Sequence, residues 1–306
     1  MLNWLRYFPL ALPFFRKYGE YVIPHGPLFP KLRKQQWYIG RSSFHFSAPW
    51  ANSVYGSEQL SRYSDSRSPG KQDVLTYELQ SINSDVIPNG RWKGSLIYSR
   101  EWYFVGPWFS GDYGDLRMAA VIYGQPHLED FKGASFFHPR VFESVIGDFL
   151  SSFFGHEKSG RKAYYRGPLH WETEVLSESV CSASFDICSD VDGSIKKYVV
   201  FPVSHDRFIS IRFSGFYQDV RSYDQTPLIN LMNSIISTFR LEVGPDMQAQ
   251  WDEVEIYCSD MSLTPEYGEL KWPVKPQDVG KPIGSVSEKT AKEGSTLLAE
   301  KLLLRE

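Results

Sequence analysis

The sequence predicts an α+β protein made of two related modules, each an antiparallel sheet covered by an amphipathic helix, plus an N-terminal arm and a C-terminal helical tail. Three observations predict this architecture. The 306 residues are enough for two ordinary domains, aromatic residues make up 16% of the chain, and two helical stripes recur 86 residues apart. Because aromatic side chains favour pleated, half-buried surfaces, most of each module is expected to be β-sheet.

The two helices are predicted at residues 139–154 and at about 226–239. Each begins with a proline at its first helical position, where the ring presets φ and no bonded N–H is lost, and Thr226 is the expected N-cap of the second helix. Apolar residues recur at steps of three and one, and all six positions coincide after the shift: Phe142, Val145, Ile146, Phe149, Leu150 and Phe153 against Leu228, Leu231, Met232, Ile235, Ile236 and Phe239. This coincidence indicates an internal repeat, and chance alignment of two amphipathic helices is the alternative.

Strand patterns occupy the remainder of both modules. Strands are predicted at residues 43–46, 74–79, 95–106 and 117–123, and then at 172–176, 179–188, 195–203, 207–213 and 254–258. Asn89-Gly90 and Asp192-Gly193 are hairpin signals, since both turn positions tolerate positive φ. The predicted boundaries are residues 1–41 for a basic aromatic arm, 42–155 and 156–258 for the modules, and 259–306 for a Pro/Gly linker and a charged helix.

Charge and cysteine content restrict the partners and the compartment. The formal net charge of −3 and the pI of about 6.2 argue against nucleic acid as a partner. Three cysteines provide no disulfide framework, so we expect structural thiols in a reducing, cytoplasmic environment. No metal and no cofactor is expected, because the histidines show no ligand spacing and no phosphate-cradling or dinucleotide motif occurs.

The N-terminal arm combines positive charge with aromatic side chains. Residues 1–41 contain seven Lys or Arg residues and one glutamate, and the segment lacks a cleavage site and the length to span a bilayer. Such an arm packs over its own domain, contacts a partner, or lies on an anionic membrane surface. The candidate contact residues are Trp4, Arg6, Phe14, Phe15, Arg16 and Lys17.

Four residues are weak candidates for catalysis. Asp112 and Asp115 flank Gly114 in a predicted tight turn, where two carboxylates serve as acid and base or hold a cation, although solvated turn acids are commoner. His138 and His205 are the other two candidates, and Ser204-His205-Asp206 is not a triad because adjacent side chains on extended backbone point apart. These residues support an alternative function as a hydrolase or transferase with a site between the modules.

The densest aromatic run lies at residues 98–109. On a strand, alternate side chains give this run two partly apolar faces, of which only one meets the covering helix. The other face packs between the modules or binds a partner. The candidate binding residues are Arg100, Trp102, Tyr103, Trp108 and Phe109.

Residues 207–213 followed by residues 228–241, a strand and then a helix that leads into a short Ser-Thr-Phe-Arg-Leu strand, resemble the closing element of the PsbP/Mog1/DcrB-like α+β sandwich families. The resemblance covers about 35 residues and implies a binding or accessory fold without a catalytic motif. The leading hypothesis is therefore a non-enzymatic protein that binds another protein, of the bacterial immunity or accessory kind. Peripheral membrane attachment through the arm is a further alternative, and the sequence leaves the oligomeric state open.

Overall fold

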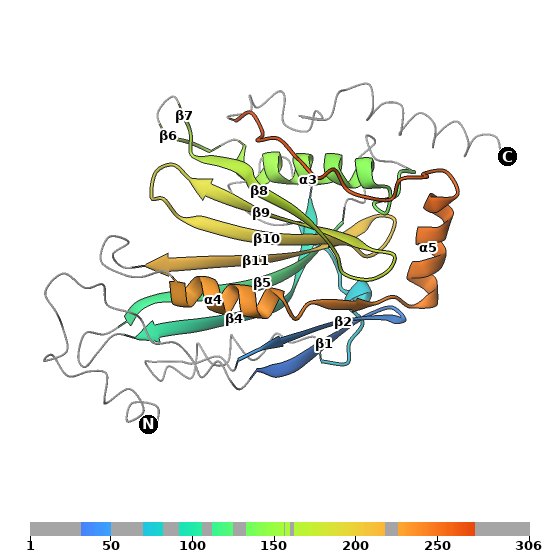
Figure 1. The fold of residues 1–306 in the computed structure, drawn as a ribbon, viewed down its shortest axis with the longest axis horizontal. Helices are drawn as coiled ribbons and strands as arrows, with labels where there is room; N and C mark the ends of the chain where they lie inside the picture. Colours follow the sequence, from blue (N-terminus) through green and yellow to red (C-terminus); the bar gives the residue numbers. More distant parts are fainter. Residues whose placement is uncertain are drawn as a thin grey trace, which may run out of the picture.

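The computed structural model describes residues 32–49, 70–81, 92–105, 112–124, 133–155, 157–159, 162–217 and 226–272. These residues form an α+β fold in which a central antiparallel sheet lies between two covering layers (Figure 1). The predicted fold class is thus confirmed at this level.

The central sheet has seven strands, in the order β3-β4-β5-β11-β10-β9-β8. The bounds are β3 (Gln80–Ser81), β4 (Lys93–Val105), β5 (Asp112–Gly124), β8 (Tyr165–Val175), β9 (Cys181–Ser189), β10 (Ile195–Pro202) and β11 (Arg207–Tyr217). Strand β11 pairs with β5 along its whole length, from Arg207 opposite Gly124 to Tyr217 opposite Gly114. Strands from both predicted modules therefore share one sheet, and the structure does not show the internal duplication.

One face of the sheet is covered by α3 (Pro139–Phe154) and by the segment 259–272 that follows the last helix (Figure 1). Alternate residues of the strands point to this side, where Trp92 and Phe149 meet edge to face with centroids 5.8 Å apart. Phe208 of β11 packs against both rings. The stripe predicted for residues 139–154 is thus the face that α3 buries.

The other face is covered by α4 (Thr226–Ile236) and by a three-stranded sheet. Its strands are β1 (Arg33–Ile39), β2 (Ser42–Ala48) and β12 (Arg240–Glu242). Phe44 of β2 stacks on Phe201 of β10 at 5.1 Å and meets Phe239 edge to face at 5.2 Å. These contacts join the two sheets into one core.

The remaining described elements are shorter. Helix α5 (Pro245–Glu255) lies at one end of the sheets, β6 (Lys158–Ser159) pairs with β7 (Lys162–Ala163), and η3 (Val74–Thr76) precedes β3 (Figure 1). The Asp192-Gly193 turn is confirmed, with Gly193 at φ +70°, whereas Asn89-Gly90 lies outside the described residues.

Several predicted elements are wrong. Residues 254–258 are not a strand, because Met247, Trp251 and Val254 follow a helical period and Val254 belongs to α5. Residues 74–79 begin as a 3-10 turn, the second helix ends at Ile236 rather than at residue 239, and β1 occupies residues predicted as arm. Asp112 and Asp115 lie within β5 rather than in a tight turn, since Asp112 pairs with Val105 of β4 and Asp115 pairs with both β4 and β11.

Candidate functional site

His205 occupies a junction of three elements. Its ring Nδ1 lies 2.8 Å from Ser135 Oγ, and its Nε2 lies 3.5 Å from a carboxylate oxygen of Glu253 on α5. The backbone N–H of His205 donates to Gln250, and its carbonyl accepts from Phe136. A serine, a histidine and a glutamate therefore meet here, with the residue types of a hydrolytic triad.

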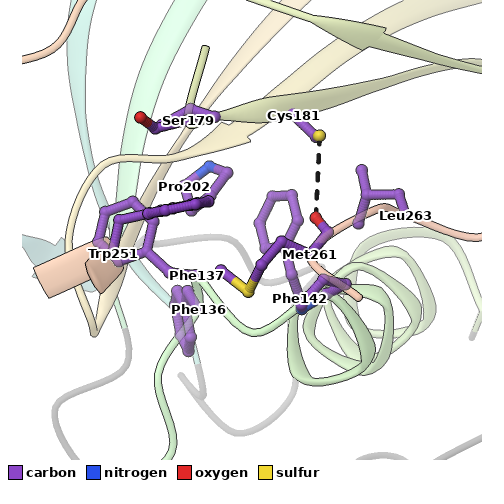
Figure 2. Close-up of a pocket in the computed structure, with 11 residues that line it drawn as sticks. Phe136, Phe137, Phe142, Ser179, Cys181, Pro202, Trp251, Met261 and Leu263 are labelled. Carbon is purple, nitrogen blue, oxygen red and sulfur yellow. Dashed lines mark hydrogen bonds between the residues drawn. The ribbon is translucent and has the colours of Figure 1, made fainter. Parts of the chain in front are cut away.

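The surroundings of this junction favour a structural role. Ser135 is only 5% exposed, and its hydroxyl also accepts a hydrogen bond from the backbone N–H of Phe137 at 3.2 Å. The neighbouring cavity, lined by Phe136, Trp251 and other side chains in Figure 2, has a volume of about 10 Å³. That volume is about one water-sized sphere, and neither Ser135 nor His205 lines the cavity, so this cavity provides no substrate site at the junction. The junction ties the loop before α3 to α5.

His138 lies on the same loop but does not extend the junction into a catalytic set. Its backbone N–H donates to the Ser135 carbonyl at 3.0 Å, which places it directly before α3. Within the described residues its Nδ1 has no hydrogen-bond partner, and burial lowers the pKa of the ring. A neutral imidazole is therefore favoured at this position.

Asp115 lies at the opposite end of the sheet from His205. Asp115 is opposite Phe216 and Gly124 is opposite Arg207, so the two sites are separated by nine residues of β11. At about 3.3 Å per residue this is about 30 Å, beyond the reach of one common substrate. The four predicted catalytic residues therefore do not form one site; the side chain of Asp112 lies outside the described structure.

The Asp115 carboxylate belongs to a small buried charge cluster. It accepts a hydrogen bond from Arg117 Nε at 2.8 Å, and the same nitrogen contacts Glu101 of β4. Burial raises the pKa of Asp115 to about 6, the attraction of Arg117 opposes this shift, and repulsion from Glu101 adds to it. Such a pKa near neutrality makes the cluster sensitive to pH.

The described members of the predicted aromatic binding surface lie in the interior. Arg100 is 4% exposed and Trp102 is fully buried, and both donate to the carbonyl of Pro49, at 3.1 and 3.2 Å. Trp102 packs in the core between the sheets. The described structure does not include Trp108, Phe109, the side chain of Tyr103 or the six residues predicted for the arm.

The segment after α5 covers part of the sheet. Glu143 of α3 is fully buried. Its carboxylate accepts hydrogen bonds from Arg140, at 2.9 and 3.0 Å, and from the backbone N–H of Thr264. Trp171 of β8 donates to the Thr264 carbonyl at 2.8 Å and stacks on Tyr267 at 4.7 Å. These contacts fix the segment between α3 and the first part of β8.

The second part of β8 forms an exposed edge of the central sheet. Residues 172–175 are all exposed, and Val175 is 69% exposed. This end of β8 lies near α5, because Ser179 in the following turn donates to Gln248 at 2.8 Å (Figure 1). Edge strands carry backbone groups that are free to pair with another chain.

The chain from the end of α4 through α5 to residue 270 is rich in exposed carboxylates, some of which pair with basic side chains of other elements, as Asp246 does with Arg41. Residues 241–270 contain eight carboxylates, all on exposed residues, and no Lys or Arg: Glu242, Asp246, Asp252, Glu253, Glu255, Asp260, Glu266 and Glu269. Ile256, at the end of α5, is 73% exposed among them. The run of carboxylates without a basic residue is visible in the sequence, and it is the signal that would have directed attention to this surface.

The three cysteines are free, and burial raises the pKa of each thiol. No group of three or more His, Cys, Asp or Glu residues in the described part of the chain is arranged to hold a metal ion. None of the described helices is long and apolar enough to cross a membrane.

Comparison with known proteins gives only distant likenesses of fold. No family model and no curated protein matches the sequence. Among solved structures, the chain is similar to LpqN of Mycobacterium tuberculosis, a protein involved in cell envelope biogenesis (10% identity, 54% of this chain and 83% of that one, TM-score 0.27). It is also similar to the immunity protein TplEi of the T6SS of Pseudomonas aeruginosa (8% identity, 78% and 83%, TM-score 0.22).

Proposed function

We propose that this chain binds another protein, in an immunity or accessory role, through the end of the central sheet where α5 meets the β8–β9 hairpin. The exposed edge of β8 at residues 172–175 carries the proposal. A sheet edge is a common attachment point for a second chain, because its backbone supplies ready-made donors and acceptors.

The composition of the surface supports the same function. Val175 and Ile256 are exposed apolar residues, and each follows an exposed glutamate in the chain, Glu174 and Glu255. Interfaces of this kind combine apolar anchors with a charged rim, and the charge selects a partner of opposite sign and accelerates association. A protein that neutralises or assists a basic partner requires such a surface.

Zero-length carbodiimide coupling tests the proposal, because it joins carboxylates to lysines. Residues 241–270 contain carboxylates and no lysine. The full-length chain is used as bait, and the captured protein is mapped by mass spectrometry. We expect cross-links to Glu253, Glu255 or Glu174, and loss of capture in the double variant Glu255→Lys, Ile256→Gln.

Ile229 provides the matched control, since it is an exposed isoleucine on α4, at the other covering layer. The Ile229→Gln variant should capture the partner as well as the unmodified chain does. Capture that survives the double variant at α5, or cross-links confined to other surfaces, would contradict the proposal.

A further inference from the structure

We infer that residues 172–175 of β8 accept an extended basic segment of the partner as an additional strand of the central sheet, with Lys or Arg side chains opposite Glu172 and Glu174. This inference rests on the proposed function and names the chemistry of the partner. It follows from the backbone of the edge, from its limits and from its charges.

The hydrogen-bonding pattern shows which backbone groups face outwards. The Leu176 N–H donates to the Val180 carbonyl at 3.0 Å, and β8 pairs with β9 in regular register from Glu172 opposite Ser184 to Val175 opposite Cys181. Hydrogen-bonded positions alternate in an antiparallel pair, so Glu174 and Glu172 bond to β9. The backbone N–H and C=O groups of Thr173 and Val175 therefore point away from the sheet. Within the described residues these groups form no hydrogen bond to another backbone group.

Contacts within the chain limit the open edge at both ends. The Leu270 N–H donates to the Gly167 carbonyl at 2.9 Å, so the segment after α5 occupies the first part of β8. At the other end β8 stops at Val175, and the carbonyl of the next residue, Leu176, accepts from the Leu241 N–H at 3.2 Å. Trp171 also donates to the Thr264 carbonyl, so the four residues 172–175 remain between Trp171 and Leu176. Their length is about 13 Å at 3.3 Å per residue, which suits a strand of four or five residues.

The side chains along the open edge define what the incoming strand must carry. Glu172 and Glu174 share one face, where Lys197 approaches Glu172 at 3.7 Å, and Thr173 and Val175 share the other. Opposite charges on directly facing residues stabilise a strand pair, and β-branched side chains pair well with each other. The fitting segment therefore alternates basic and β-branched residues.

The same charges disfavour a second copy of this chain as the occupant. In a two-fold antiparallel pair of β8 strands centred on Glu174, that residue lies opposite its own copy, and in a pair centred on Thr173, Glu172 lies opposite Glu174. Like charges directly opposite each other destabilise the pair. The charge pattern of the edge thus selects a different, basic chain.

Two synthetic peptides of equal length, one alternating Lys and Val and the other alternating Glu and Val, test the inference with the full-length protein. We expect the Lys peptide to bind, to weaken as salt is added, and to slow hydrogen exchange of the Thr173 and Val175 amides. The Glu peptide should not bind. Absence of binding by the Lys peptide, or protection confined to other amides, would overturn the inference.

Thr173→Pro removes one outward N–H while leaving the bonds of β8 to β9 intact, because proline is tolerated where the N–H of an edge strand faces solvent. We expect at least a tenfold loss of Lys-peptide affinity, with Thr173→Ala close to the unmodified protein, and hydrogen exchange of β9 amides reports whether the fold is retained. If Thr173→Pro binds the peptide normally while the α5 double variant loses the captured partner, strand addition is refuted and the proposed function stands. If the unmodified protein forms a dimer and Thr173→Pro abolishes that dimer, the edge binds a second copy of this chain, and the inference of a basic partner strand is refuted.

Discussion

Replacing Asp115 by asparagine should stabilise the protein above pH 6 and leave its stability at pH 4 nearly unchanged. The carboxylate is buried in β5, with a side chain 7% exposed, and burial raises its pKa from 3.8 to about 6. The protonated form is therefore favoured in the folded state. Its contribution to stability is present below about pH 4 and is lost as the pH rises through 6.

The size of the effect follows from the same pKa. One pKa unit corresponds to about 1.4 kcal/mol, so the move from 3.8 to about 6 makes the ionised carboxylate cost about 3 kcal/mol of folding free energy at neutral pH. Asparagine has the same shape and no charge, and Arg117 keeps its contact with Glu101. We expect a gain of about 1 to 3 kcal/mol at pH 8, because the amide loses part of the attraction to Arg117.

Urea unfolding at intervals between pH 4 and pH 8 measures this difference directly. The unmodified protein and the variant should have parallel curves except between pH 4 and 6, where only the unmodified protein loses the Asp115 contribution. Glu266→Gln, which removes an exposed carboxylate, is the control for a general charge effect. Equal pH dependence in the Asp115→Asn variant and the unmodified protein would refute the reasoning.

Three further substitutions test the packing. Glu143→Gln should lower the free energy of unfolding by about 2 to 4 kcal/mol, because the buried ion pair with Arg140 loses its negative partner. The segment after α5 should then become accessible to proteases. Urea unfolding and limited proteolysis measure these two effects, and a segment that stays protected would contradict the prediction. Gly244→Ala should lower the melting temperature, since its Cβ would lie 2.3 Å from the Arg41 carbonyl oxygen, and an unchanged melting curve would show that the backbone shifts freely. Ser135→Ala should lower the free energy of unfolding by about 1 kcal/mol, because it removes the hydroxyl that is hydrogen-bonded to His205. If the unmodified chain has a hydrolytic activity and Ser135→Ala abolishes it, the junction is a catalytic triad and the structural interpretation is wrong.

The sequence predicted correctly those elements that a pattern of a few neighbouring residues is enough to identify. The apolar stripe of α3 and the Asp192-Gly193 turn are of this kind, and both occur as expected. Helix α5 was missed although Gly244-Pro245 marks its start, because its buried face consists only of Met247, Trp251 and Val254 and most of its surface is polar. A short apolar run such as residues 254–258 does not by itself distinguish strand from helix.

The long-range arrangement could not be obtained in this way. Pairing of β5 with β11 joins residues that are 83 to 103 positions apart, and nothing within either strand specifies its neighbour. The burial of Trp102 depends likewise on β1 and β2, which come from a part of the chain predicted as an arm. His205 was predicted only as a weak catalytic candidate, and its partners Ser135 and Glu253 reach it from other elements, which the sequence around His205 does not indicate.

The position of the aromatic side chains explains why recognition by this chain should depend on charge and backbone. Both faces of the central sheet are covered, and Trp37, Trp92 and Trp102 are fully buried, so these large contact faces are used for internal packing. Within the described residues the edge of β8 at 172–175 is exposed and carries Glu172 and Glu174. Backbone pairing tolerates many side chains, whereas exposed charges are screened within about 10 Å at 0.1 M salt. We therefore expect added salt to weaken partner binding more than truncation of any described aromatic side chain that leaves the fold intact.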